Sequence, residues 1–170
     1  MARTRDQKRR TKKYNPKNKH VLMNPVGFVL EGMAPVSSER EALKKLRWVN
    51  HTALDTIRLG FGGKAQVTTL LEAFNISTAL CRLGIGQEGA EIIEKGLLSV
   101  QSMMERARKV QRCVFTGEEL SNVCLAMTIH DEQFEICRLG ELEKARLMVL
   151  NETKHKKVRV IETTGLEMIQ

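Results

Sequence analysis

Apolar residues recur every three to four positions through most of the chain from residue 38 onward, which is the spacing of a helix with one buried face. Four long segments carry the pattern, at about 38–59, 65–83, 87–112 and 116–139, and a shorter one continues to about residue 152. The face predicted for the first segment includes Leu43, Leu46, Val49, Asn50, Ala53, Leu54 and Ile57. The face predicted for the fourth comprises Leu120, Val123, Cys124, Met127, His130, Phe134 and Cys137.

Start and stop signals agree with these boundaries. Ser38 with Glu41, and Thr116 with Glu119, have the spacing of a capping box, in which two side chains satisfy free N–H groups at a helix N-terminus. Glycines within 60–63 and 84–86 follow the first two segments, and glycine commonly ends a helix. Around Gly140 the pattern kinks or restarts.

The predicted fold is therefore all-α: an antiparallel bundle of four to five helices formed by residues 21–152. A short helix at about 24–31 would precede the long ones, since Asn24 and Pro25 are typical of a helix start. Aromatic residues make up only 4% of the chain, so we expect a core of Leu, Ile, Val, Met and Ala. Residues 153–170 are expected to form a basic, extended or disordered tail.

The net charge of the chain lies entirely in its first 20 residues. This stretch contains nine of the 28 Lys and Arg and one of the 20 Asp and Glu, which leaves 19 of each sign from Val21 onward. Residues 1–20 contain almost nothing apolar, so we expect a disordered basic arm attached to a neutral domain. A flexible segment with a charge of +8 is attracted to polyanions.

We expect the arm to contact the phosphates of DNA or RNA. The predicted contacts are Arg3, Arg5, Lys8, Arg9, Arg10, Lys12, Lys13, Lys17 and Lys19. Arginine predominates among the first ten residues, which favours bidentate phosphate contacts. A weaker basic patch near the other terminus consists of Lys154, Lys156, Lys157 and Arg159.

Enzymatic chemistry has little support in the sequence. The glycines at 60–63 lack the spacing of a phosphate-binding loop, and no strand precedes them. His51 and His130 each have a carboxylate nearby, but neither has a Glu three residues before it, as a di-metal bundle site requires. We expect no metal and no cofactor. His130 is expected to face inward and to bond a buried polar partner, such as Asn50 or Asn75, which would fix the helix register.

The cysteines and the absence of sorting signals indicate a cytoplasmic protein. Cys81, Cys113, Cys124 and Cys137 form no CxxC pair and are expected to be small buried residues in a reducing compartment. No apolar run resembles a signal peptide, and none approaches the length of a membrane span.

Several stretches resemble small proteins encoded by phages, prophages and integrative elements. The resemblance rests on RTRDQKRRTKKYNPK and NPVGFVLEGM, on NHTALDTIRLGFG and FNISTALCRLGIGQE, and on HDEQFE, and it spans about residues 1–150. It implies a mobile-element protein that acts inside a bacterial cell. It implies no catalytic residues, because these proteins have no assigned function.

Two functions are consistent with this sequence. The first is a non-enzymatic accessory protein that binds nucleic acid through its basic arm. The second is a protein-binding inhibitor or modulator of a host complex, such as a defence system or the transcription machinery. Few aromatic residues are available for a protein interface, unless Trp48 and Phe61 are exposed. An apolar bundle face left uncovered would favour a homodimer. A basic arm that serves only as a solvated tail would bind neither class of partner.

Overall fold

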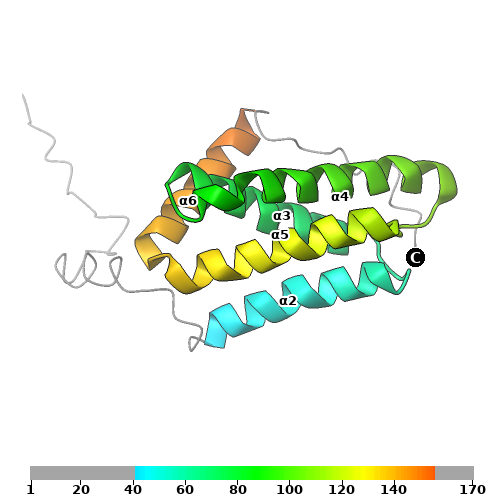
Figure 1. Cartoon of the computed structure of the whole chain (residues 1–170), viewed down its shortest axis with the longest axis horizontal. Coiled ribbons are helices and arrows are strands. Elements are labelled where there is room, and N and C mark those ends of the chain that lie inside the picture. The colour runs from blue at the N-terminus through cyan, green and yellow to red at the C-terminus, as the bar shows by residue number, and fades with distance from the viewer. Residues whose placement is uncertain (1–40, 156–170) are drawn as a thin grey trace, which may run out of the picture.

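A computed structural model describes residues 41–155, and it has the all-α fold that the sequence predicts (Figure 1). The helices are α2 (Glu41–Arg58), α3 (Lys64–Arg82), α4 (Ala90–Val110), α5 (Gly117–Ile136) and α6 (Leu139–Lys154), with a short 3-10 helix, η1 (Gln87–Gly89), before α4. The predicted arm, the short helix at 24–31, Ser38 and the tail from residue 156 lie outside the described residues.

Helix α3 is the centre of the bundle. It packs against α2, α4, α5 and α6, whereas the closest pair of helices is α4 with α5. In Figure 1 the helices α2, α5 and α4 run side by side, and α6 crosses them at an angle near the end where α2 begins. None of the described helices is long and apolar enough to cross a membrane.

The core is aliphatic and methionine-rich, as the composition predicts. Its larger part lies between α2, α3, α4 and α5 around Phe74, and a smaller part joins α3, α5 and α6 around Leu80 and Phe134. Met103, Met104 and Met127 are fully buried in the larger part. Methionine fills irregular gaps between helices well, because its side chain is long and unbranched.

Helices α4 and α5 approach closely at Gly96. A Cβ atom at this position would lie 2.5 Å from the Cβ of Ala126, so only glycine fits without moving the helices apart. The contact is completed by a hydrogen bond from Asn122 Nδ2 to Ser99 Oγ, 3.2 Å long.

The predicted helix boundaries are mostly confirmed. Thr116 is the N-cap of α5, with its hydroxyl accepting from the backbone of Glu119 and the carboxylate of Glu119 accepting from the backbone of Thr116. Gly60 and Gly84 follow α2 and α3 with φ of +83° and +87°. Near Gly140 the pattern restarts, since α5 ends at Ile136 and α6 begins three residues later.

Some predictions about single positions are wrong. Leu46 and Val49 of α2 are exposed, as is Cys124 of α5, although all three were expected on buried faces. Helical spacing gives the direction of a side chain but not the width of the face that a neighbouring helix covers. Helix α6 also continues to Lys154, two residues into the stretch predicted as an extended tail.

Candidate nucleic-acid interface at one end of the bundle

Two connections that are distant in sequence meet at the end of the bundle on the right of Figure 1. The turn between α2 and α3 and the link between α4 and α5 are joined by an antiparallel β-bridge between Gly62 and Cys113. The guanidinium of Arg112 lies over Gly60, because a Cβ on that glycine would come within 2.6 Å of Nη2. We call residues 58–64 together with residues 108–116 the basic tip.

The first half of the basic tip is a rigid turn. The backbone N–H of Gly60 donates to Ile57 (2.9 Å), and that of Phe61 donates to Thr56 (3.0 Å). These two bonds define a Schellman motif, which needs the left-handed backbone that Gly60 supplies. Gly62 then lies directly against α2, since a Cβ there would be 2.4 Å from Ile57 Cγ1.

The second half is held by a partly buried ion pair. Arg106 donates to both carboxylate oxygens of Glu119, at 2.9 and 2.6 Å, and to the backbone oxygen of Val114 at 2.9 Å. Hydrogen bonds from the Arg106 guanidinium lower the pKa of Glu119 to about 2, so this carboxylate is charged at neutral pH. The pair spans the link from α4 to α5 and fixes its path.

The basic tip contains five cations and no acidic residue: Arg58, Lys64, Arg108, Lys109 and Arg112. All five are exposed. Arg58 pairs with Asp55 one turn earlier (3.1 Å), while Lys109 and Arg112 form no ion pair with any residue of 41–155. Arg108 and Lys109 also lie in the last turn of α4, where cations favour the helix dipole.

The structure describes one of the site residues that the sequence predicts. Lys154 is exposed in the last turn of α6. The arm residues Arg3, Arg5, Lys8, Arg9, Arg10, Lys12, Lys13, Lys17 and Lys19, and Lys156, Lys157 and Arg159 of the second patch, lie outside the described residues. The basic tip itself was not predicted, because no local pattern shows that two loops 50 residues apart will touch.

His130 is the centre of a buried polar group, as the sequence predicts. Its Nε2 is 3.2 Å from Asn50 Nδ2, and its Nδ1 is 2.7 Å from Ser77 Oγ. The predicted pairing with Asn50 is therefore confirmed, whereas Asn75 takes no part and the serine was missed. Burial lowers the pKa of His130 to about 4, so the ring is neutral at physiological pH.

A second polar layer joins α2 to α5 on the surface above His130. Asp131 Oδ2 is 2.8 Å from His51 Nε2, and Asp131 Oδ1 is 3.3 Å from Arg47 Nε. Arg47 also reaches Glu135 at 2.5 Å. These side chains tie together two helices whose backbones are not in close contact. The carboxylates of Asp131 and Glu135, which are close to His130 in the sequence, thus serve as ion-pair partners.

The described residues offer few groups for catalysis or metal binding. No group of three or more His, Cys, Asp or Glu side chains within 41–155 could hold a metal ion. Cys81, Cys113 and Cys137 are buried, and burial raises the pKa of each thiol, in the case of Cys137 to about 11. Thiols with raised pKa values are poor nucleophiles.

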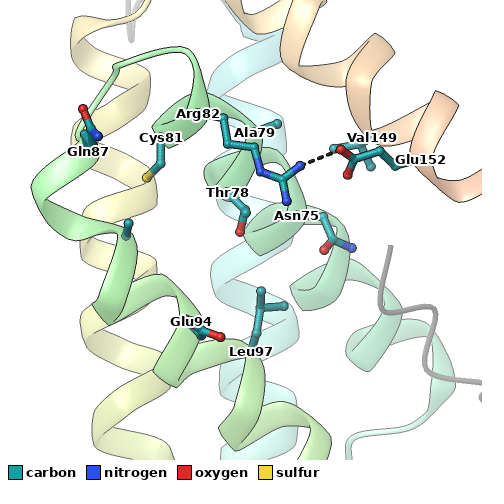
Figure 2. A pocket seen from close by; sticks show the side chains of 11 residues that line it. Asn75, Thr78, Ala79, Cys81, Arg82, Gln87, Glu94, Leu97, Val149 and Glu152 are labelled. Atoms are coloured by element: carbon teal, nitrogen blue, oxygen red, sulfur yellow. Dashed lines mark hydrogen bonds and ion pairs between the residues drawn. The ribbon is translucent and has the colours of Figure 1, made fainter. Parts of the chain in front are cut away.

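A surface pocket of about 460 Å³ lies between α3, α6 and the start of α4 (Figure 2). The ion pair between Arg82 and Glu152, 2.5 Å long, closes one side of it. Glu94, Asn75 and Thr78 also line the pocket, and the Thr78 hydroxyl already donates to the backbone of its own helix. This mixed lining, with two carboxylates, does not suit a nucleic acid.

Comparisons with known proteins give no relative for this chain. No protein-family model matches it, and neither does any curated protein or solved structure. Its function must therefore be argued from its own residues.

Proposed function

We propose that this chain is a non-enzymatic accessory protein of a phage or other mobile element, and that it binds nucleic acid through its basic arm. One observation carries the proposal: the entire net charge of +8 belongs to residues 1–20. Cations that neutralise phosphates release counterions, and this release supplies most of the affinity of non-specific nucleic-acid binding.

The charge distribution in the described residues supports the same function. From residue 21 onward the chain is neutral, but its cations are not evenly spread, since the basic tip holds five of them and no acid. A folded, rigid surface of this kind would give the flexible arm a second point of contact on the same polyanion.

Several features favour a binding protein over an enzyme. Within residues 41–155 the serine–histidine contact is between Ser77 and His130, and a substrate cannot reach it, because both residues are at most 1% exposed. The His130 ring also has a lowered pKa, which makes it a weaker general base.

A salt titration of binding to DNA and RNA tests the proposal. The full chain would be compared with a variant in which Arg3, Arg5, Lys8, Arg9, Arg10, Lys12 and Lys13 are all replaced by Gln. Seven phosphate contacts predict a slope of log K against log salt of about −5 for single strands and about −6 for duplex. We expect the variant to lose most of this slope and of the affinity at low salt.

A matched variant provides the control. Replacing Lys154, Lys156, Lys157 and Arg159 with Gln removes fewer charges from the other terminus, and we expect it to weaken binding much less. If the arm variant bound as tightly as the natural chain, the arm would not be the nucleic-acid contact and the proposal would be wrong.

A second candidate function is inhibition or modulation of a host protein complex. One observation favours it: Trp48 and Phe61, the aromatic residues most suited to a protein interface, are both exposed. Capture of host proteins from a nuclease-treated lysate separates the two functions. A partner retained after nuclease treatment, and lost in a Trp48→Ala variant, supports this candidate.

A further inference from the structure

The most exposed large apolar side chains of the described residues are aromatic. Phe61 is 80% exposed and Trp48 is 69% exposed, whereas Phe74, Phe115 and Phe134 are buried. The chain contains only one Trp, one Tyr and five Phe. Two of the few aromatic residues of this chain therefore present flat apolar rings to solvent, where a ligand can reach them.

The turn itself does not force Phe61 outward. A Schellman motif usually places an apolar residue after its glycine, where the side chain packs back onto the helix. The same motif after α3 follows this rule, since Ile85 packs against the core beside Leu80. Phe61 has the equivalent position after α2 but extends into solvent, although its backbone N–H and that of Gly60 are hydrogen-bonded to the end of the helix. The ring is therefore presented by a rigid support.

Cations lie close to the backbone from which this ring extends. Phe61 follows Gly60, over which the Arg112 guanidinium lies, and Lys109 is on the adjacent end of α4. Leu59 and Val110 add exposed apolar surface to the same two connections. The basic tip thus combines a flat aromatic group with positive charge, and it contains no carboxylate.

Trp48 lies on α2, the helix that leads into this turn. It is 10 residues before the helix ends at Arg58, a distance of about 15 Å along the axis. Lys44 is exposed one turn before Trp48. Helix α2 therefore carries one exposed aromatic residue at Trp48 and leads into a second at Phe61.

We infer that Phe61 and Trp48 are stacking platforms for unpaired bases, and that the nucleic acid bound by this protein is single-stranded. The inference rests on the proposed function. Aromatic rings stack on single-stranded bases of any sequence, while neighbouring cations hold the phosphates. In a duplex each base already stacks on its neighbours, so an exposed ring finds no free base face there. The positive charge of the basic tip favours a nucleic-acid strand, rather than an apolar protein surface, as the partner of these rings.

Binding of the full chain to labelled oligothymidylate and oligouridylate of about 20 nucleotides, and to a duplex of equal length, tests the inference. We expect Phe61→Ala to weaken single-strand binding by about 10-fold, with duplex binding and the salt slope unchanged, because the phosphate contacts remain. Phe61→Trp should restore binding. The two oligonucleotides show whether DNA or RNA is preferred.

Trp48 offers a direct readout, since it is the only tryptophan of the chain. Stacking of a base on the indole should quench its fluorescence as oligothymidylate is added, and the duplex should quench it much less. Leu98→Ala removes an exposed apolar residue of α4, about 18 Å from Val110 along that helix, and should change neither binding nor quenching. Thermal unfolding of all variants should be unaltered, because each side chain is exposed.

The outcomes separate this inference from the proposed function. If the arm variant loses binding while Phe61→Ala binds single strands normally and Trp48 is not quenched, the arm binds nucleic acid and the stacking inference is wrong. If Phe61→Ala loses binding and the arm variant does not, stacking is supported and the role of the arm is refuted. If the full chain binds no oligonucleotide, both fail, and the exposed rings then belong to a protein-binding surface.

Discussion

At the scale of single residues, His130 sets the protonation chemistry of the core. With the amide nitrogen of Asn50 donating to Nε2, the neutral ring must carry its proton on Nδ1 and donate it to Ser77 Oγ. This arrangement satisfies both ring nitrogens without a charge. A protonated ring would instead place a cation in the core beside an amide N–H that also donates, and the nearby charge of Asp131 offsets only part of the cost of burial.

This burial predicts a pH dependence of stability. The pKa of His130 falls from 6.5 in the unfolded chain to about 4 in the folded protein, so between these values the unfolded state binds more protons. The contribution of His130 to the free energy of unfolding is therefore fully present above about pH 6.5 and is lost as the pH falls. We expect a loss of about 2 to 3 kcal/mol by about pH 4.5, measured by urea unfolding of the full chain.

A His130→Gln variant is the matched control, because the amide can bond both neighbours but does not titrate. Its stability should be lower overall and nearly constant across the same pH range. Glu119 does not confuse the result, since its lowered pKa affects stability mainly below about pH 5 and does so equally in both proteins. An equal decline in both proteins would show that another group causes it.

At the scale of helices, the close approach of α4 and α5 at Gly96 predicts an effect of substitution that is opposite to intrinsic helix propensity. Alanine is favoured over glycine in a helix by about 1 kcal/mol, so Gly→Ala usually stabilises. In Gly96→Ala the new methyl would overlap Ala126 on α5, and overpacking of this kind costs about 1 to 3 kcal/mol. We therefore expect a net loss of stability, measured by chemical unfolding. Gly117→Ala, with open space around its Cβ at the start of α5, should be neutral or stabilising.

The sequence predicted the parts of the fold that depend on neighbouring residues. The capping box at Thr116 and the glycine at position 60 act within one turn of helix, so their patterns are local and were read correctly. The pairing of His130 with Asn50 followed from two polar residues on buried faces. Ser77, the other hydrogen-bond partner of His130, has no such signal, because serine is common on both exposed and buried helix faces.

The candidate site depended on contacts that no local pattern contains. The basic tip forms where Gly62 meets Cys113, and this pairing depends on the packing of all the helices between them. The exposure of Phe61 was equally unpredictable, since the same turn after α3 buries its apolar residue. The basic arm was evident from charge alone, but charge gives neither its path nor its partner.

At the scale of the whole molecule, the two positive regions are attached at opposite ends of α2. The helix begins at Glu41, after the predicted arm and the 20 residues that link it, and ends at the basic tip, about 27 Å away along its 18 residues. A strand that contacts both the start of α2 and the basic tip spans this distance. Two contacts on one ligand then reinforce each other, because the second forms at a high effective concentration.

This geometry predicts that affinity depends on the length of the strand. A stacked strand advances about 3.4 Å per nucleotide, so about eight nucleotides cover the length of α2. We expect oligothymidylates shorter than this to bind weakly and longer ones to bind more tightly by at least about 10-fold, beyond the statistical gain from extra sites. The Arg and Lys→Gln arm variant and a Lys109→Gln, Arg112→Gln variant should each lose the increase, because each retains one contact only. Fluorescence anisotropy over a series of lengths measures it. If each variant kept the full increase, the two positive regions would not share one strand, and the arm would bind independently of the folded domain.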